Sequence, residues 1–383
     1  MSSQDQINKA LAAADHPVMV ESENHLQEVV KDLQACEVIG IDTEFVRERT
    51  WRANLGLVQI SDGKTVWLVD PLSTGPLHPL AGLLENERIM KILHAPSEDL
   101  DVLLYTTGAV PKPLFDTQIA CALLGQSLQM GYHKTVEWLL DIAIDKGETR
   151  SNWCKRPLRP AQLHYAALDV CLLPIMYRQL QTRLRDLGRE DWLREDCSRS
   201  LNKALTPADP EQSWKRINGN GRLDGRSRAI LQSLARWRDE EAERRNLARG
   251  FVIKDNALLT MANNQPKNLD ALAKLDVCHP RTLERHGPAL LGVIDEVLQN
   301  RLTAKPQEIL QPGQRKLLAD MRQLVLKKAQ ELSIEPTLLA TKKELELLIL
   351  SPPGEPLPER FEGWRKHIIT ADLLALKDAF KEP

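Results

Sequence analysis

The sequence predicts an α/β domain built on a mixed β-sheet, followed by a region that is helical throughout. Up to about residue 201, short apolar runs typical of buried strands alternate with segments of helical periodicity. Asp62-Gly63, a strong hairpin turn, separates two of these runs, and a hairpin that leads into β-α-β units favours a mixed sheet with helices on both faces. Beyond the polar stretch 206–210, strand patterns are no longer found.

The elements of the first domain follow from hydrophobic periodicity and from turn residues. Strands are expected at residues 18–20, 38–43, 56–61, 65–70, 89–94 and 114–116. Helices are expected in the frayed extension 1–16, at 22–34 and 77–85, and after Thr117 and Pro160. Pro174 is expected to end or kink the helix that starts at Pro160.

The helical region predicts two modules of about 80 residues each, joined by a second linker at 306–313. Apolar residues of the first module recur in the second at a constant offset of 87 residues. The matched residues are Leu231, Leu234 and Ala242 in the first module and Leu318, Met321 and Ala329 in the second.

The composition is that of an ordinary globular protein, with 42% hydrophobic and 27% charged residues. No apolar run approaches the roughly 18–20 residues that span a bilayer, and the N-terminus lacks the pattern of a secretory signal. Six cysteines without a C-x-x-C pair indicate reduced thiols and a cytoplasmic protein. A net charge of −2 argues against coating nucleic acid by bulk electrostatics, but it allows a local basic surface.

Two carboxylates stand at the end of the expected central strand. Asp42 and Glu44 follow the apolar run 38–41 and are separated by one residue, so strand alternation places both on one face. Neighbouring anions that have lost solvation repel each other, and a bound cation relieves the repulsion. Two solvated acids in a turn are the simpler alternative for this stretch taken alone.

A second acidic stretch follows the expected strand 89–94, where a loop opens a helix. Glu98, Asp99 and Asp101 are all candidates, because ligand groups in α/β sheets gather at such strand ends. Acids in the first turn of a helix also favour the helix dipole without any ligand.

A third acid, Asp169, lies in a helix that is otherwise apolar on that side, and Tyr165, four residues before it, shares its face. Together the acids of three separated segments would form a cluster of hard oxygen ligands suited to Mg²⁺ or Mn²⁺. Two such ions about 4 Å apart would activate water and hold a phosphodiester. The histidines are too dispersed for a zinc site.

Three segments, 42–45, 94–100 and 151–170, resemble the exonuclease motifs of the DEDD superfamily, and their order resembles that of the bacterial ribonuclease D family. Segments 234–242 and 251–255 resemble HRDC domains. The resemblance implies an RNase H-like exonuclease domain followed by two all-α HRDC-like domains. The expected boundaries are 1–17 for an N-terminal extension, 18–205 for the exonuclease, 210–300 for the first HRDC-like domain and 312–380 for a divergent second one.

The resemblance also implies 3′→5′ hydrolysis of RNA to nucleoside 5′-monophosphates with two divalent cations, Mg²⁺ or Mn²⁺. By the family pattern, the metal ligands are Asp42, Glu44, Asp99 and Asp169, with Asp42 bridging the ions and Tyr165 orienting the attacking water. Single-stranded 3′ ends, such as those of tRNA precursors, are the expected substrates, and no obligate protein partner or membrane is expected.

The family has a tyrosine type, Y-x3-D, and a histidine type, H-x4-D, and both spacings end here on Asp169. If Pro160 opens the helix, His164 points about 100° away from Tyr165 and off the acid face. We therefore expect Tyr165 to be the catalytic residue and His164 to be structural.

Contacts to RNA are expected from basic residues after the first motif, before the Tyr165 helix and in the first helical module. These are Arg47, Arg49, Lys155, Arg156, Lys215, Arg216, Arg244 and Arg245. Ordinary exposed cations are the alternative for each of them. Trp153 is expected to anchor the core rather than to stack on a base.

Two rival functions remain open from the residues alone. A DNA-directed 3′→5′ exonuclease would share the same acids, since no residue here visibly recognises a 2′-hydroxyl. A non-catalytic nucleic-acid scaffold is the rival from another class, and the complete set Asp42, Glu44, Tyr165 and Asp169 argues against it.

Overall fold

The computed structural model describes residues 2–144, 147–148, 151–207, 209–305, 310–352 and 354–380. The chain divides into two compact units, one of residues 1–46, 55–206 and 310–383 and the other of residues 47–54 and 207–309. Among the described residues, none of the helices has the length and apolar character needed to cross a membrane.

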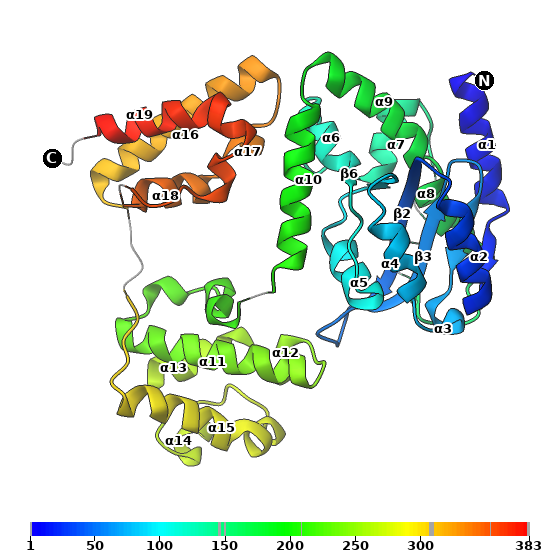
Figure 1. The fold of residues 1–383 in the computed structure, drawn as a ribbon. Helices are drawn as coiled ribbons and strands as arrows, with labels where there is room; N and C mark the ends of the chain where they lie inside the picture. The colour runs from blue at the N-terminus through cyan, green and yellow to red at the C-terminus, as the bar shows by residue number, and fades with distance from the viewer. Residues whose placement is uncertain are drawn as a thin grey trace. The chain divides into compact units, whose positions relative to one another are not determined.

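The first unit is organised around one six-stranded sheet (Figure 1). Its strands are β1 (Val18–Val20), β2 (Val38–Val46), β3 (Asn54–Ser61), β4 (Val66–Val69), β5 (Met90–Leu93) and β6 (Leu114–Asp116), in the order β1-β4-β3-β2-β5-β6. The β3–β4 hairpin is antiparallel, whereas β4 pairs with β1, β2 with β5 and β5 with β6 in parallel. The predicted mixed sheet is confirmed, and β2 continues three residues beyond the expected end at residue 43.

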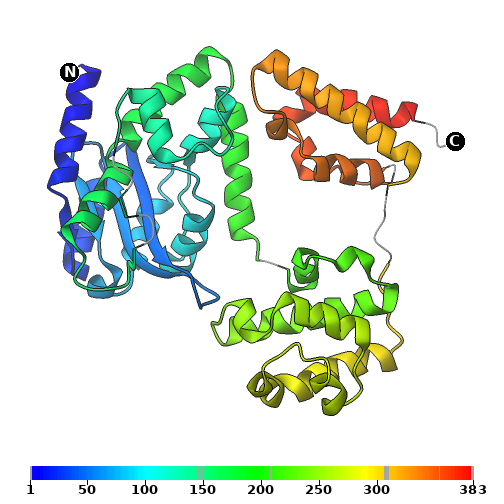
Figure 2. The same cartoon turned by 180° about the vertical axis from the view of Figure 1, so that it is seen from behind.

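Helices cover both sides of this sheet (Figures 1 and 2). Before β6 they are α1 (Ser3–Asp15), α2 (Glu23–Leu33), α3 (Pro71–Thr74), α4 (Ala81–Leu84) and α5 (Ser97–Thr107). After β6 they are α6 (Thr117–Leu123), α7 (Tyr132–Leu140), α8 (Pro160–Cys171), α9 (Leu173–Asp186) and α10 (Glu190–Leu205). The helix expected at 77–85 is a 3₁₀ turn, His78–Leu80, that leads into the short α4. Pro174 acts as predicted, because α8 ends at Cys171 and Pro174 lies in the first turn of α9.

The second unit is helical. It contains the 3₁₀ turns Pro210–Arg216 and Asn220–Arg222 and the helices α11 (Gly225–Arg244), α12 (Arg249–Val252), α13 (Asp255–Asn264), α14 (Leu269–Ala273) and α15 (Pro280–Gln299). Leu234, Leu258 and Leu290, from three different helices, are completely buried in its core. The predicted boundary 206–210 includes Ala208, which lies outside the described residues.

Residues 47–54, which connect β2 to β3, belong to this helical unit. The Ala248 N–H donates to the Arg49 carbonyl over 2.8 Å, and the Arg249 guanidinium lies 4.2 Å from the ring centroid of Trp51. Arg52 pairs with Glu243 over 2.8 Å.

The helices α16 (Pro312–Leu332), α17 (Pro336–Leu339), α18 (Lys342–Leu350) and α19 (Ala371–Ala379) belong to the first unit. Three of them repeat the second unit at the offset of 87 residues: α16, α17 and α18 begin at 312, 336 and 342, and α11, α12 and α13 begin at 225, 249 and 255. The predicted linker 306–313 ends earlier than expected because α16 begins at Pro312, and its residues 306–309 lie outside the described part of the chain.

These C-terminal helices pack against α10. Arg365 is completely buried and forms two hydrogen bonds with the Asp196 carboxylate, at 2.7 and 2.8 Å. The rings of Trp192 and Trp364 stack in parallel with 4.3 Å between centroids. The second helical module is therefore held to the sheet unit by a buried ion pair and by aromatic packing.

Candidate active site

Strand β2 presents two acids toward helix α8. Asp42 and Glu44 share the strand face of Gly40, because side chains on one face recur every second residue. At Gly40 the helices come so close that an added Cβ would lie 2.8 Å from the Cβ of Leu173 and 3.0 Å from the Val170 carbonyl oxygen. Asp169, one residue before Val170, is thereby held against β2.

The structure brings Asp42, Glu44 and Asp169 together. One carboxylate oxygen from each lies within 4.8 Å of the others. Both β2 acids are partly buried, as the apolar strand that carries them is in the core. Three carboxylates so close together in a poorly solvated site repel one another unless protons or cations neutralise them.

The titration of these acids reflects that crowding. Burial, together with the charges of Asp99, Asp169 and Glu44, raises the pKa of Asp42 well above its usual value. Burial and the neighbouring acids raise the pKa of Glu44 to about 9, and burial raises that of Asp169 to about 7 despite the hydrogen bond from Tyr165. Without a cation, the cluster therefore holds protons at neutral pH.

Asp99 is the acid of the second stretch that the structure places beside this cluster. The Thr43 hydroxyl, between the two β2 acids in sequence, donates a short hydrogen bond to the Asp99 carboxylate. Burial raises the pKa of Asp99 to about 6, partly offset by this bond. Glu98 and Asp101 are exposed, so the choice among the three acids left open by the sequence falls on Asp99.

Tyr165 and His164 lie on different sides of α8. The Tyr165 hydroxyl is hydrogen-bonded to Asp169, and burial and the nearby acids raise the pKa of Tyr165. His164 is exposed, and its Nδ1 lies 3.5 Å from the Asp15 carboxylate of α1. Trp153 is 1% exposed with its ring centroid 6.2 Å from that of Tyr165, in keeping with a core anchor.

Asp116 was missed by the sequence reasoning. It caps α6 by accepting from the Gln118 and Ile119 N–H groups, and it also accepts from the Ala95 N–H over 3.1 Å. Ala95 has a φ of 55° in the turn that leads into α5, so Asp116 fixes the turn that delivers Asp99. An acid at a strand end immediately before a helix is the available sequence signal.

The structure gives Arg156 a different role from the expected RNA contact. Its guanidinium makes five hydrogen bonds, to both carboxylate oxygens of Asp70 and to the carbonyls of Gly56, Trp153 and Lys155. Since a guanidinium has five N–H donors, none is left for a phosphate. We correct the assignment of Arg156 from RNA contact to internal support.

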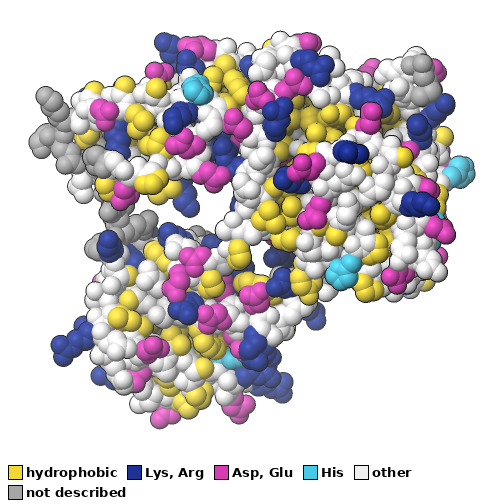
Figure 3. Space-filling model, in the orientation of Figure 1, with side chains coloured by type: hydrophobic (Ala, Val, Ile, Leu, Met, Phe, Trp, Pro, Cys, Tyr) yellow, Lys and Arg dark blue, Asp and Glu magenta, His cyan; other side chains and the backbone are white. Residues whose placement is uncertain are grey.

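The other basic candidates lie at the surface or near it. Arg47 and Arg49 are exposed in the segment packed with the helical unit, together with Lys215, Arg216 and Arg244 of that unit. Arg245 is partly buried, with its guanidinium 3.7 Å from the Glu241 carboxylate and 3.4 Å from the His286 ring. On the face shown in Figure 3, basic and acidic side chains are interspersed over the helical unit.

The donor set of the cluster fits a hard divalent cation. All three converging groups are carboxylates, with no thiolate or imidazole among them. Oxygen-only ligand sets suit Mg²⁺ and Mn²⁺ rather than zinc. A mixed sheet with two acids on β2, a third on helix α5 and a fourth on helix α8 that is bonded to a tyrosine defines a metal-dependent 3′–5′ exonuclease of the DEDD class.

Comparisons with known proteins give the same class, 3′–5′ exonucleases, and identify one family within it. Residues 17–185 match the 3′-5′ exonuclease family model, and residues 227–294 match the HRDC domain model. Ribonuclease D from Pseudomonas paraeruginosa is 39% identical over 350 residues, which cover 89% of this chain and 92% of the relative. Ribonuclease D from Escherichia coli is 32% identical over 363 residues, which cover 93% and 96%. The chain belongs to the ribonuclease D family and is a 3′–5′ exoribonuclease.

Solved structures agree with this assignment. The crystal structure of Escherichia coli RNase D, described as an exoribonuclease involved in structured RNA processing, matches with a TM-score of 0.89 and 31% identity, covering 96% of this chain and all of that one. The predicted exonuclease fold followed by an HRDC domain is thereby confirmed. A protein from Bifidobacterium adolescentis, 21% identical with a TM-score of 0.71, shares the fold.

Proposed function

We propose that this chain hydrolyses RNA from the 3′ end with two bound divalent cations, Mg²⁺ or Mn²⁺, and releases nucleoside 5′-monophosphates. The observation that carries the proposal is the convergence of Asp42, Glu44 and Asp169 within 4.8 Å. Two of these acids lie in one strand and the third lies 125 residues beyond Glu44, in a helix, so their meeting is a property of the fold.

The proposed ligands are Asp42, Glu44, Asp99 and Asp169, with Asp42 shared between the two ions. Asp42 suits the shared position because the charges of all three other acids act on it. When bound, the cations activate water and neutralise the charge that develops on the phosphodiester. Thr43 would hold the Asp99 carboxylate in one orientation through its hydroxyl.

Tyr165 is the proposed residue that orients the attacking water. Its raised pKa keeps the phenol protonated at neutral pH, so it donates its one O–H to Asp169, its oxygen accepts a hydrogen bond from the attacking water, and it does not act as a base. The hydrogen bond to Asp169 fixes the phenol at the edge of the acid cluster. Packing beside the buried Trp153 restricts the ring further.

A direct test supplies RNA and DNA oligomers of the same sequence, each labelled at the 3′ end, with Mg²⁺ or Mn²⁺. We expect mononucleotide release from RNA that is lost with chelator and in Asp42→Asn, and lost in Tyr165→Phe far more than in His164→Ala. Faster cleavage of the DNA would favour the DNA-directed alternative. Binding of RNA without any release under either metal would favour a non-catalytic scaffold.

Single-stranded 3′ ends, including those of tRNA precursors, are the proposed substrates in the cytoplasm. The 3′ end has to reach partly buried acids, which a flexible terminus does more readily than a paired one. The related Escherichia coli enzyme is described as acting in structured RNA processing, which supports tailed, structured RNAs as the substrate class. The six cysteines, all described and all free thiols, fit a reducing compartment.

We further propose the domain boundaries 18–205, 210–300 and 312–380, after an extension at 1–17, with residues 312–380 as a second, divergent HRDC-like copy. The three helix starts repeated at 87 residues support this assignment. The first copy is the proposed auxiliary RNA-binding surface, through Lys215, Arg216 and Arg244. Replacing these three residues by alanine should lower the salt dependence of RNA binding.

A further inference from the structure

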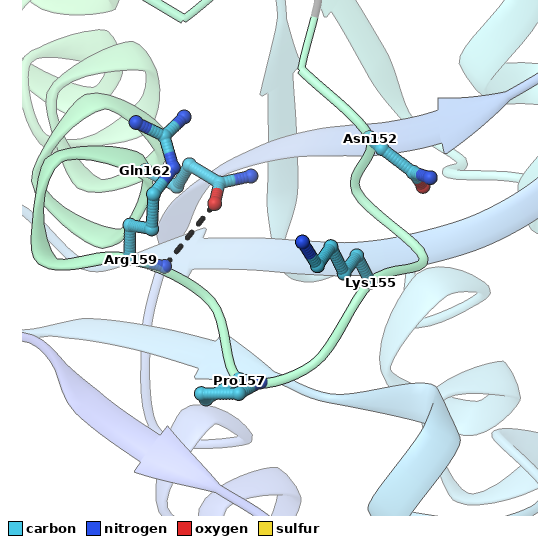
Figure 4. Close-up of a pocket in the computed structure, with 5 residues that line it drawn as sticks. All are labelled: Asn152, Lys155, Pro157, Arg159 and Gln162. Atoms are coloured by element: carbon cyan, nitrogen blue, oxygen red, sulfur yellow. Dashed lines mark hydrogen bonds between the residues drawn. The ribbon is translucent and has the colours of Figure 1, made fainter.

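A pocket of about 260 Å³ lies in the segment that precedes and opens α8. It is lined by Asn152, Lys155, Pro157, Arg159 and Gln162 (Figure 4). Among the described residues, the lining contains two cations and two carboxamides and no acid. That chemistry suits an anion with several acceptor oxygens.

Two unused donors point into this pocket. The Lys155 ammonium and the Gln162 carboxamide are both directed toward the interior of the loop in Figure 4. Lys155 is exposed, and its ammonium pairs with no acid in the part of the chain that the structure describes. Gln162 is only 5% exposed, and its Oε1 accepts from the Arg159 N–H over 3.1 Å, which leaves the amide N–H₂ to face the pocket.

The frame of the pocket is fixed before any ligand arrives. Arg156, next to Lys155, is anchored by the Asp70 carboxylate and by three carbonyls. On the other side, Arg159 donates to Glu148, whose charge it neutralises, and to Ser151. A preformed site loses little ordering entropy on binding.

The pocket lies on the same side of α8 as the acid cluster. Gln162, Tyr165 and Asp169 have the spacing i, i+3, i+7, which places them along one helix face. Seven residues correspond to roughly 10 Å along the axis. Because successive phosphates of one strand lie farther apart than the ~3.4 Å rise of stacked nucleotides, this distance spans at most about three nucleotides. The pocket also lies at the positive end of the α8 dipole.

We propose that this pocket is a subsite for a backbone phosphate of the RNA, at most about three nucleotides upstream of the scissile bond. Lys155 supplies the charge, and the Gln162 amide supplies a directed hydrogen bond. The inference rests on the proposed function, because it assumes that a 3′ end occupies the acid cluster. It assigns Lys155 and Gln162 to substrate binding and not to the chemical step.

The test measures steady-state kinetics of the full-length protein on RNA oligomers of two to eight nucleotides. Lys155→Ala removes the charge, and Gln162→Glu replaces the donor while keeping the Oε1 acceptor for Arg159. Lys31→Ala on α2, also an exposed lysine, is the matched control. A Lys155→Arg variant tests whether charge alone restores binding.

For oligomers of five or more nucleotides, we expect KM to rise about tenfold in Lys155→Ala and in Gln162→Glu, with kcat unchanged. The slope of log affinity against log salt should fall by about 0.7 in Lys155→Ala, the value for one single-strand phosphate contact. Dinucleotides should show no difference, Lys155→Arg should behave as wild type, and Lys31→Ala should have no effect.

An unchanged KM on long oligomers, or an equal loss on dinucleotides and octamers, would overturn the subsite. So would a fall in kcat at constant KM. Each of these results requires that the wild type degrades RNA, whereas a wild type that is inactive on every length would contradict the proposed function itself. The two failures are therefore distinguishable.

Discussion

Gly40 of β2 and Leu173 of α9 are so close that a methyl group on the glycine would lie 2.8 Å from the leucine Cβ. This approach lets the end of α8 lie directly on the strand that carries Asp42 and Glu44. Asp169, in the last turn of α8, then lies beside the two β2 acids. A side chain as small as a methyl group at one position thus controls whether the acids can meet.

Replacing Gly40 by alanine should displace α8 from β2. We expect a loss of about 1–3 kcal/mol in the free energy of unfolding, the usual cost of overpacking, and at least a tenfold fall in kcat on RNA. Gly82→Ala is the control, because a Cβ at Gly82 would meet no atom within 4 Å. Urea unfolding measures the change in the free energy of unfolding, and single-turnover cleavage measures the rate on RNA. Wild-type activity in Gly40→Ala would show that the contact between β2 and the helices does not position the acids.

Metal binding should release protons and should strengthen as the pH rises. At pH 7, Glu44 with a pKa of about 9 is protonated and Asp169 with a pKa of about 7 is half protonated, whereas a metal requires both as carboxylates. Calorimetric titration with Mn²⁺ in two buffers of different ionisation enthalpy counts the protons. We expect at least one proton per protein at pH 7 and weaker binding at pH 6. Binding that is independent of pH between 6 and 9 would contradict this.

Glu44→Gln should make the metal-free protein more stable while it abolishes cleavage. Burial and the neighbouring acids raise the pKa of Glu44 to about 9, so at pH 7 the folded protein must protonate a group that is ionised in the unfolded chain, and glutamine removes this cost. A gain of about 1–2 kcal/mol is expected, since one pKa unit corresponds to 1.36 kcal/mol. Urea unfolding in chelator measures it, with the exposed Glu28→Gln as control. A less stable metal-free variant would show that these acids do not strain the fold.

Local sequence signals were sufficient for the parts of the site that depend on periodicity. The run Val38–Ile41 predicted β2, and strand alternation put Asp42 and Glu44 on one face. Helical geometry turned Tyr165 toward Asp169 and His164 away from it, because that depends only on the 100° step.

Contacts between segments distant in sequence could not be predicted in this way. No local pattern shows that the Arg156 guanidinium donates hydrogen bonds to Asp70, 86 residues earlier. Nor does any pattern show that residues 47–54 pack with the first helical module, or that Arg365 is buried against α10. Such contacts are selected by the whole fold, so they follow only from the structure.

The Asp196–Arg365 pair should hold the C-terminal module to α10. Arg365→Met leaves the Asp196 charge buried without its main partner, and we expect a loss of roughly 3 kcal/mol in the free energy of unfolding. Adding Asp196→Asn should recover part of that loss, because no charge is then left buried. Urea unfolding of the single and double variants tests this, and a double variant less stable than Arg365→Met would contradict it.

The Asp196–Arg365 pair should also make the stability of the fold depend on pH below about pH 4. Hydrogen bonds and charge from Arg365 hold the pKa of Asp196 below its ordinary value of 3.8, although burial opposes them. A carboxylate whose pKa is lower in the folded protein than in the unfolded chain stabilises the fold fully at pH values above the pKa of the unfolded chain. This stabilisation is lost as the pH falls toward the pKa in the folded protein. The stability difference between wild type and Asp196→Asn should thus be constant from pH 7 to 5 and should shrink below pH 4. A difference that grows below pH 4 would show the wrong sign.

Removing the C-terminal module is a poor way to test its part in RNA binding. Truncation before α16 would expose Trp192 and leave the Asp196 carboxylate without Arg365. A loss of activity would then reflect the damaged α10 surface. Substitution of exposed basic residues in the intact chain separates RNA affinity from stability.

The number of Mn²⁺ ions bound by the protein tests most directly whether the acids of β2 and α8 form one metal centre. Electron paramagnetic resonance of free Mn²⁺ during a titration at pH 8 gives this number for wild type, Asp42→Asn and Asp169→Asn. We predict two ions for the wild type, a loss of both in Asp42→Asn and a loss of at least one in Asp169→Asn, each with cleavage of RNA abolished. Wild-type binding of Mn²⁺ in both variants would contradict the central claim.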